Sequence, residues 1–354
     1  MSATAMHSRT PSTSTSSRSK TLLAAVSAAG LFLTACNGGG DAEAGGEDAN
    51  GCDFAPDYPS GPVEIIVPWA AGGGTDSVAR LVADQLSNEL GTQVNVVNRD
   101  GGSGVVGHQA MADASPDGQT IGLVTVEIGM MHWQGLTELT SEDLTGIAQI
   151  NEDPAGITVA DDAEWETAQE LLDYIEANPG DVVGSGTGQG GIWHLALIDM
   201  LLEAGLEPDA VNFVPSDGAA PALQELVAGG VDVTTSSLGE NLTMIESGDV
   251  RPLAVMGTES DPNFPDVPTL EEETGLDAGV GVWRGIAGPA DMDEDVVAEL
   301  ECHIENVVNS EEYAEFMADS GLGVAYADSE EFTALMLEDD EEKGVLMEEA
   351  GLAE

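Results

Sequence analysis

The feature that most constrains the fold of this chain is a regular alternation of short apolar segments with helical patterns. Residues 63–68 (VEIIVP) are apolar and β-branched, which is typical of a buried strand. Residues 75–90 then place apolar side chains at helical spacing, and Gly91 ends that helix. The alternation is repeated along the chain and predicts an α/β fold with parallel-rich sheets flanked by helices.

The same pattern gives expected bounds for the other elements. Further strands are expected at residues 94–98, 120–126, 181–184, 211–215, 231–235 and 251–256. Further helices are expected at residues 107–114, 167–178, 192–205, 219–228, 294–308, 311–320, 329–337 and 341–349. Residues 147–160 are expected to be extended, with a break at Asp153-Pro154. Because the two halves of this pattern look alike, they indicate two similar lobes with a cleft between them.

The charge of the chain excludes several classes of partner. Its 354 residues include 66 Asp and Glu against 8 Lys and Arg, which gives a formal net charge of −58. Such a chain cannot neutralise the phosphates of DNA or RNA, and it carries no basic patch for an anionic membrane surface. The strongly acidic surface predicts a protein that works in high salt, where counter-ions screen its self-repulsion.

The first 35 residues are interpreted as a targeting segment. A Ser/Thr-rich stretch carries Arg9, Arg18 and Lys20, and the apolar run TLLAAVSAAGLFL follows at residues 21–33. The run ends in Leu-Thr-Ala-Cys, which resembles a bacterial lipobox with Cys36 as the lipidated residue. The alternative is an ordinary cleaved signal with a chance cysteine. The Gly-rich acidic residues at 36–57 favour the lipoprotein, because they form a flexible, solvated tether.

Cys52 and Cys302 remain after the targeting segment. Outside the cytoplasm an even pair of cysteines usually forms a disulfide, which here joins the start of the folded part to a late helix. The alternative is two unrelated buried thiols. No metal site is expected, because the cysteines and the five histidines show no ligand spacing.

Two glycine-rich turns, each between a strand and a helix, are the most informative candidate sites. The first lies at residues 67–76 (VPWAAGGGTD) and the second at residues 183–194 (VGSGTGQGGIWH). Glycine lets the backbone turn sharply, and a helix N-terminus offers unpaired N–H donors with partial positive charge. Such a junction can hold a carboxylate or phosphate without a Lys or Arg side chain. The alternative is a tight turn of an α/β sheet, but a matching pair in the two halves favours binding.

Three other kinds of site can contain such turns. Residues 186–191 match the dinucleotide pattern G-x-G-x-x-G, with Asp217 as a ribose partner, although a lone match is weak evidence for NAD. A P-loop is excluded, because Lys343 is the only lysine after the targeting segment. The chain has no G-x-S-x-G motif for a serine hydrolase, and no acid is positioned to orient His194 as a base.

Several motifs together resemble one known family. They are residues 58–62 (YPSGP), 67–76, 98–99 (NR), 117–118 (DG), 220–223 (APAL), 251–255 (RPLAV), 265–271 (PDVPTLE) and 283–285 (WRG). From residue 58 to the C-terminus the chain is similar to the extracytoplasmic solute-binding proteins of tripartite tricarboxylate transporters, the Bug (Bordetella uptake gene) family.

The resemblance implies a two-lobed fold like that of type II periplasmic binding proteins, with lobe 1 at residues 58–157 plus 281–354 and lobe 2 at residues 158–280. It implies an extracytoplasmic binding protein, not an enzyme and without a cofactor, and the lipobox indicates that this protein is lipid-anchored. Such a protein captures a small di- or tricarboxylate and delivers it to the membrane subunits of a transporter. The alternatives are a receptor that feeds a sensor kinase and, less favoured, a secreted oxidoreductase.

The resemblance and the glycine turns together predict the ligand-binding residues. They are Trp69, Ala71, Gly72, Gly73, Thr75, Asp76, Thr125, Ser185, Gly186, Thr187, His194, Ser216, Asp217, Gly218 and Ser236. Asp76 is expected to cap its helix, and Trp69 to form a wall of the site or to pack in the core. Trp283 and Arg284 are assigned to the hinge or the core. The sequence departs from its relatives at Ser216-Asp217 and at Thr235-Ser236, so the ligand's identity is left open, and Asp217 is either a partner for an amine or a solvated loop carboxylate.

Overall fold

The computed structural model describes residues 51–257 and 260–353. The targeting segment, Cys36 and the tether as far as residue 50 lie outside this range. The folded part already begins at Cys52, which is buried and forms a disulfide with Cys302. The backbone N–H of Phe54 donates to the Glu299 carboxylate at 2.7 Å, so the segment before Tyr58 is fixed to a helix.

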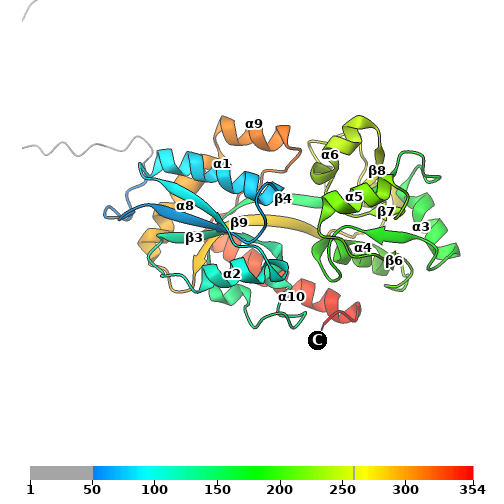
Figure 1. The fold of residues 1–354 in the computed structure, drawn as a ribbon, viewed down its shortest axis with the longest axis horizontal. Helices are drawn as coiled ribbons and strands as arrows, with labels where there is room; N and C mark the ends of the chain where they lie inside the picture. The colour runs from blue at the N-terminus through cyan, green and yellow to red at the C-terminus, as the bar shows by residue number, and fades with distance from the viewer. Residues whose placement is uncertain (1–50, 258–259, 354) are drawn as a thin grey trace, which may run out of the picture. The chain divides into compact units, whose positions relative to one another are not determined.

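Two β-sheets share one long strand, and Figure 1 shows their elements. The first sheet has the order β2-β1-β3-β9-β4, and its strands are β1 (Val63–Val67), β2 (Val94–Asn98), β3 (Thr120–Thr125), β4 (Leu144–Ala160) and β9 (Gly281–Pro289). The second sheet continues from β4 through β7 (Val233–Thr234), β5 (Val183–Ser185) and β6 (Asn212–Phe213), and β8 (Val250–Met256) also pairs with β4. Pairs among the outer strands of each sheet are parallel, whereas the pairs that involve β4 or β9 are antiparallel.

The expected break at Asp153-Pro154 is wrong, because β4 runs through it without interruption. Residues up to Pro154 pair with β9, and residues from Ala155 onward pair with β8. Pro154 is tolerated because the strand changes pairing partners there, so the N–H that proline lacks does not interrupt a continuous ladder of hydrogen bonds. Gly281 faces this point, since a Cβ there would lie 2.7 Å from the Asp153 carbonyl oxygen.

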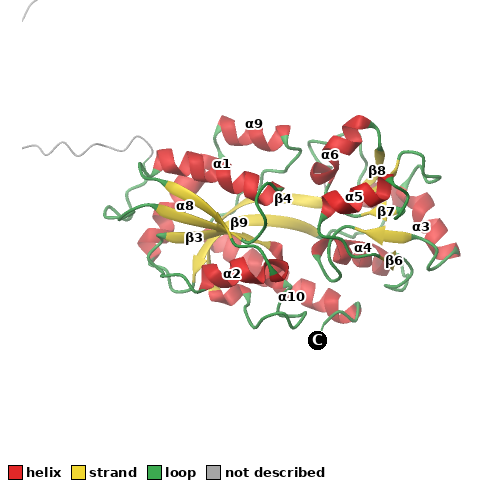
Figure 2. Ribbon diagram, in the orientation of Figure 1, coloured by secondary structure: helices red, strands yellow, loops and turns green. Residues whose placement is uncertain are grey.

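Helices cover both faces of the first sheet (Figure 2). One face packs against α1 (Gly74–Glu89), α8 (Glu294–Val308) and α9 (Glu311–Asp319), and the other against α2 (Val105–Ala112) and α10 (Ser329–Glu349). Successive residues of β1 enter the two layers, with Ile65 in the first core and Ile66 in the second. The apolar run of the sequence therefore reflects a strand that is buried on both faces.

Helix α10 is continuous, so the two helices expected at residues 329–337 and 341–349 are wrong as separate elements. Asp339, in the acidic stretch between the two expected helices, is buried and forms an ion pair with Lys343. Gly344 allows the helix to lie against Trp133, because a Cβ there would lie 2.3 Å from the indole.

The second sheet is flanked by five helices. They are α3 (Ala168–Ala177), α4 (Ile192–Glu203), α5 (Ala219–Val227), α6 (Leu238–Ser247) and α7 (Leu270–Thr274). The first three lie where the sequence predicts them, and α6 and α7 were not predicted. Strands β6 and β7 are each two residues long, shorter than expected, because the glycine-rich and polar loops begin directly after them.

Candidate functional site at two glycine turns

The first glycine turn connects β1 to α1, and its backbone is open to solvent. Residues 71–74 are exposed, Gly72 has φ +91°, and Gly73 is the N-cap of α1. The first N–H groups of α1 have no acceptor within the helix, so they face outward with the positive end of the helix dipole. The turn therefore leaves amide donors open to solvent at the place where the sequence predicts an anion site.

Asp76 fastens this turn rather than facing a ligand. Its carboxylate is 3% exposed and accepts from the Gly72 N–H at 2.8 Å, from the Asn98 side chain at 2.9 Å and from Arg80 at 2.9 Å. The N-cap is Gly73, so the predicted capping role is corrected: Asp76 reaches back to the residue before the cap. Burial alone would raise the pKa of Asp76, but the hydrogen bonds from Arg80, Gly72 and Asn98 outweigh it and lower the pKa.

Trp69 and Thr125 belong to a hydrogen-bonded chain beside the first turn. The Trp69 indole N–H donates to Thr125 Oγ1 at 3.2 Å, and that hydroxyl donates to Glu127 at 2.6 Å. The Thr125 backbone N–H donates to Nε2 of the buried His108 at 3.2 Å, while His108 Nδ1 donates to the Gly104 carbonyl at 2.9 Å. Burial lowers the pKa of His108 to about 4, so this ring is neutral and holds the end of β3 in place.

The second glycine turn connects β5 to α4 and is tied to its own helix. Gly191 is the N-cap of α4 and its N–H donates to the Gly188 carbonyl at 3.0 Å. The Gly190 N–H donates to His194 Nδ1 at 3.0 Å. Gly186 is required by close packing, because a Cβ there would lie 2.7 Å from the Trp193 Cβ. The exposed part of the backbone at this turn is therefore at Thr187 and Gly188.

His194 has a structural role in this turn. Its ring stacks on Phe213 with centroids 3.9 Å apart, and burial lowers its pKa to about 4. Since Nδ1 accepts from the Gly190 N–H, the ring is neutral with its proton on Nε2. The hydroxyl of Ser185 is also engaged, because it donates to the Val214 carbonyl at 2.8 Å.

The remaining predicted residues lie around the second turn. The Ser216 N–H donates to the Thr187 carbonyl at 2.9 Å, which brings the segment of Asp217 and Gly218 beside the turn. Asp217 is exposed, and Gly218, with φ +122°, is the N-cap of α5. Ser236 is fully buried and donates to the Asn241 side chain at 2.8 Å, so its hydroxyl is engaged inside the second sheet's core.

A charged network between the two turns was missed by the sequence reasoning. Arg284 on β9 donates to Thr75 Oγ1 at 3.1 Å and to Asp153 on β4 at 2.7 Å. The same guanidinium contacts Asn151, and all three partners of this buried group come from distant parts of the chain. Arg284 also interacts electrostatically with Glu127 and with Glu240 on α6. The Arg284 and Asp153 pair is 131 residues apart in sequence, so no local pattern could have indicated it.

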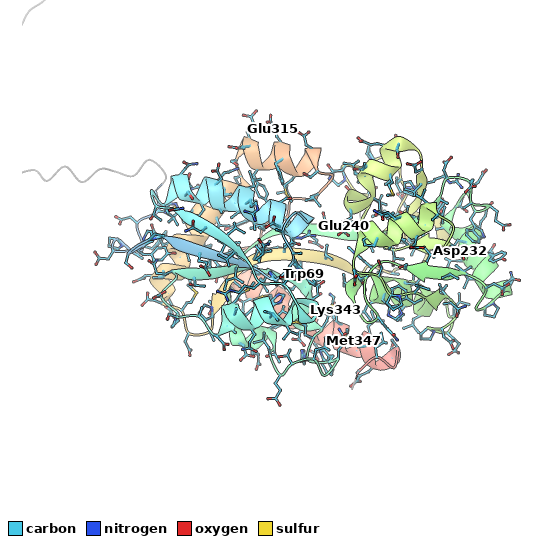
Figure 3. The ribbon with its side chains drawn as sticks, in the orientation of Figure 1. Trp69, Asp232, Glu240, Glu315, Lys343 and Met347 are labelled. Atoms are coloured by element: carbon cyan, nitrogen blue, oxygen red, sulfur yellow. A yellow bond between two sulfur atoms is a disulfide. The ribbon has the colours of Figure 1, made fainter. Side chains whose placement is uncertain are left out.

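Glu240 is the member of this network that belongs to the second sheet's helices. It is exposed, and it accepts a hydrogen bond from Trp193 in the first turn of α4. Figure 3 labels Glu240 together with Trp69 beside the first glycine turn. The network therefore reaches from Thr75 at the first turn to Trp193 at the second.

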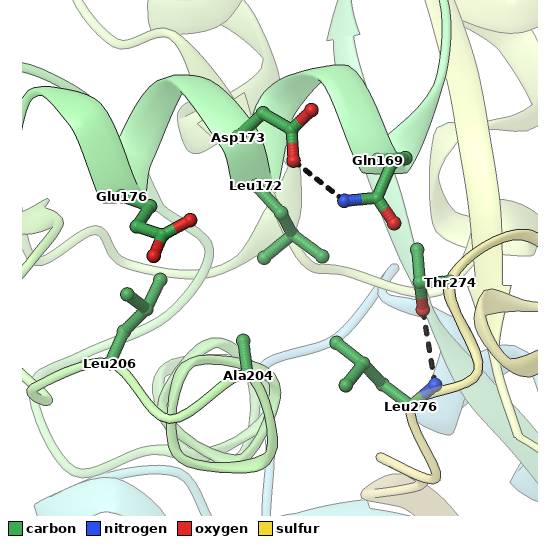
Figure 4. A pocket seen from close by; sticks show the side chains of 8 residues that line it. All are labelled: Gln169, Leu172, Asp173, Glu176, Ala204, Leu206, Thr274 and Leu276. Carbon is green, nitrogen blue, oxygen red and sulfur yellow. Dashed lines mark hydrogen bonds between the residues drawn. The ribbon is translucent and has the colours of Figure 1, made fainter.

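One pocket in the described part of the chain lies away from these turns. It has a volume of about 150 Å³ and is lined by residues of α3, the end of α4 and the end of α7, including Leu172, Glu176 and Leu276 (Figure 4). It shares no lining residue with either glycine turn. Residues 51–257 and 260–353 also contain no gathering of three or more His, Cys, Asp or Glu side chains that could hold a metal ion. None of the helices in those ranges has the length and apolar content needed to cross a membrane.

Comparison with known proteins identifies relatives of the chain. The family model of the tripartite tricarboxylate transporter family receptor (TctC) matches residues 78–352. Protein BugT of Bordetella pertussis is 29% identical over 75% of this chain and 82% of BugT. A protein encoded in the tcbD-tcbE intergenic region of Pseudomonas sp. strain P51 is 30% identical over 76% of this chain and 80% of its own length.

Solved structures of similar proteins share the fold. A TctC solute-binding protein from Polaromonas, without ligand, is 34% identical with a TM-score of 0.71 and covers 82% of this chain and 99% of its own. The periplasmic binding protein BugD is 28% identical with a TM-score of 0.72 over 84% of this chain and 99% of its own. MatC from Rhodopseudomonas palustris with bound malate is 25% identical with a TM-score of 0.70 over 82% of this chain and 99% of its own. These matches confirm the predicted α/β binding-protein fold.

Proposed function

Because this chain belongs to the tripartite tricarboxylate transporter receptor family, we propose that it binds a small carboxylate outside the cytoplasm. The first glycine turn carries this proposal. The exposed backbone at Gly73 and Gly74, at the N-terminus of α1, forms an anion site that needs no basic side chain. The structure of MatC, which is 25% identical to this chain, contains bound malate, and this supports a carboxylate ligand.

The ligand is held between two lobes, residues 58–157 plus 281–354 and residues 158–280. Strand β4 supports this division, since it changes from its β9 pairing to its β8 pairing between Pro154 and Ala155. The Gln134 side chain donates to the Gly190 carbonyl at 3.2 Å, so the first lobe already contacts the second turn. Closure of the lobes around the ligand gives a membrane partner a state that it can distinguish from the empty one.

The protein is anchored by a lipid on Cys36 and delivers its ligand to integral membrane subunits. The lipobox-like end of the targeting segment supports the anchor. Replacement C36S is expected to move the protein from the membrane fraction to the soluble fraction. Co-purification from detergent-solubilised membranes tests the partner, and recovery of a sensor kinase instead of transporter subunits would favour the receptor alternative.

A pair of glycine variants tests the ligand site itself. At Gly73 an added methyl group has space, with its nearest atom, the Ala70 carbonyl oxygen, 3.9 Å away. G73A therefore leaves the fold intact but covers the amides, and we expect it to weaken carboxylate binding by about tenfold, or 1.4 kcal/mol. Isothermal titration of residues 37–354 in molar salt with succinate, glutarate, malate and citrate measures the effect.

The matched control is G91A, at the far end of α1, where the added methyl group also has open space. Because Gly91 has φ +59°, this control carries backbone strain, so its free energy of unfolding is measured alongside its affinity. Equal carboxylate affinity in G73A and G91A, or binding of none of the acids by the natural chain, would contradict the proposed function.

A further inference from the structure

A buried guanidinium is in direct contact with the first glycine turn. Arg284, on β9, is 6% exposed, and its Nε donates to Thr75 Oγ1 at 3.1 Å. Thr75 lies in the first turn of α1 and directly follows the exposed residues 71–74. The contact joins two residues 209 positions apart in the sequence, so β9 reaches the turn that is proposed to hold the ligand.

The orientation of this guanidinium is fixed by residues of β4. Its Nη1 donates to Asp153 at 2.7 Å and also contacts Asn151, and both of these side chains are buried. Gly323 in turn holds both partners, because its N–H donates to Asp153 at 2.7 Å and its carbonyl accepts from Asn151 at 2.6 Å. A guanidinium is planar, so acceptors fixed at Nη1 also fix the direction in which Nε donates.

The contact with Arg284 determines what the Thr75 hydroxyl can do. An arginine only donates hydrogen bonds, so Thr75 Oγ1 accepts here, and the hydroxyl proton points away from Arg284. Within residues 51–257 and 260–353, this hydroxyl has no other hydrogen-bond partner, and Thr75 is only half-buried. A hydroxyl that accepts from a charged donor is polarised and becomes a stronger donor itself. The Thr75 O–H is therefore an oriented donor whose acceptor is not supplied by the described residues.

We propose that Arg284 is a positioning residue of the first glycine turn, and that it orients the Thr75 hydroxyl as a donor to the bound carboxylate. This inference rests on the proposed function and adds one side chain to the backbone site at Gly73 and Gly74. The charge of Arg284 is itself paired with Asp153. The ligand is therefore met by an oriented hydroxyl and not by a free cation.

A double-mutant cycle tests this arrangement, because it shows whether Thr75 and Arg284 act through one another. T75V removes the hydroxyl at nearly constant volume and is expected to weaken carboxylate binding about tenfold, whereas T75S keeps a hydroxyl and should lose less. R284K keeps a cation for Asp153 but loses the Nε donor, and a loss of about fivefold is expected. The combined variant T75V/R284K is expected to bind about as weakly as T75V alone.

Affinities are measured by titration calorimetry of residues 37–354 in molar salt. The probe is whichever of succinate, glutarate, malate and citrate the natural chain binds most tightly. The control variant is R251K, which makes the same substitution on β8, where the guanidinium donates to the backbone carbonyls of Asp161, Ala163 and Trp165. R251K is expected to lose stability but to keep its carboxylate affinity, which separates a loss of stability from a loss of binding.

If R284K does not fold, R284M/D153N takes its place in the cycle, because it removes both charges and leaves no buried charge unpaired. The inference is overturned if T75V or the Arg284 variant binds as tightly as the natural chain, or if their separate losses multiply in the combined variant. In each of these cases the proposed function stands. If the natural chain binds none of the four acids, the proposed function fails and the inference fails with it.

Discussion

The first glycine turn is held in place by charge, whereas the second is held by aromatic packing. In the first, Asp76 binds the Gly72 N–H and the side chains of Arg80 and Asn98, which leaves the following amides exposed. In the second, Trp193 packs against Gly186, and the His194 ring accepts a hydrogen bond from the Gly190 N–H. Two turns with similar sequences therefore differ: the amides that follow Gly72 stay exposed in the first, whereas the N–H groups of Gly190 and Gly191 are engaged within the second.

The largest effect is expected from removing the close packing of the second turn. G186A places a Cβ 2.7 Å from the Trp193 Cβ, which cannot move far because it is attached directly to the backbone of α4. We expect a loss of about 1–3 kcal/mol in the free energy of unfolding, as for other overpacked sites. Chemical denaturation in molar salt measures it. G188A is the control, because its methyl group meets nothing within 4 Å, and equal stability of the two variants would refute the packing account.

A smaller effect is expected at the first turn. D76A removes a carboxylate that accepts from Gly72, Arg80 and Asn98, and a charged hydrogen-bonding group of this kind is worth about 2 kcal/mol. D76N keeps an acceptor for the Gly72 N–H and should lose less. Because the pKa of Asp76 is lowered, its contribution is present above the ordinary pKa of an Asp and is lost as the pH falls through the lowered value.

Acid titration followed by circular dichroism compares the natural chain with both variants. The difference between the natural chain and D76A should shrink toward low pH. A difference that stays constant down to strongly acidic pH would show that the carboxylate's charge does not hold the turn.

The smallest effect concerns the network that lies between the turns. Protein atoms surround the Glu240 carboxylate although solvent reaches it, and this raises its pKa to about 7, while Arg284 opposes the shift and Asp153 and Glu127 add to it. A raised carboxyl pKa favours the folded state at low pH, and that contribution is lost as the pH rises through about 7.

Thermal unfolding of the ligand-free protein tests this sign. E240Q should unfold at a higher temperature than the natural chain at pH 8, with a smaller difference at pH 5. E246Q, at another exposed position of α6, is the control for the loss of one surface charge. An E240Q advantage that is as large at pH 5 as at pH 8 would contradict the assignment to Glu240.

Local patterns in the sequence were enough for much of the fold. Strand β1, helix α1 and both glycine turns were predicted at their observed positions, because period, turn residues and helix ends are all encoded within a few residues. Helix α6 was missed, since its polar sequence LGENLTMIES buries only Leu238 and Asn241. The continuous β4 was missed because Pro154 signals a break unless the change of pairing partner is known.

The site could be predicted only in part, for the same reason. The turns of residues 71–76 and 185–187 are local features, and the sequence indicates them. Glu240, Glu127 and Asp153 are linked through their interactions with Arg284. Each of them is more than 40 residues away from Arg284 in the sequence. His194 and Ser236 were predicted as ligand-binding residues, but in the structure both side chains form internal hydrogen bonds.

The entry of the chain into the fold has a mechanical consequence. Cys52 is bonded to Cys302 on α8, and the N–H groups of Phe54 and Ala55 bind Glu299 on the same helix. A pull applied through residue 51 is therefore taken up by α8 before it can reach β1 at Val63. Tension along the N-terminal segment bypasses the strand that carries the first glycine turn, so it does not distort the amides of that turn.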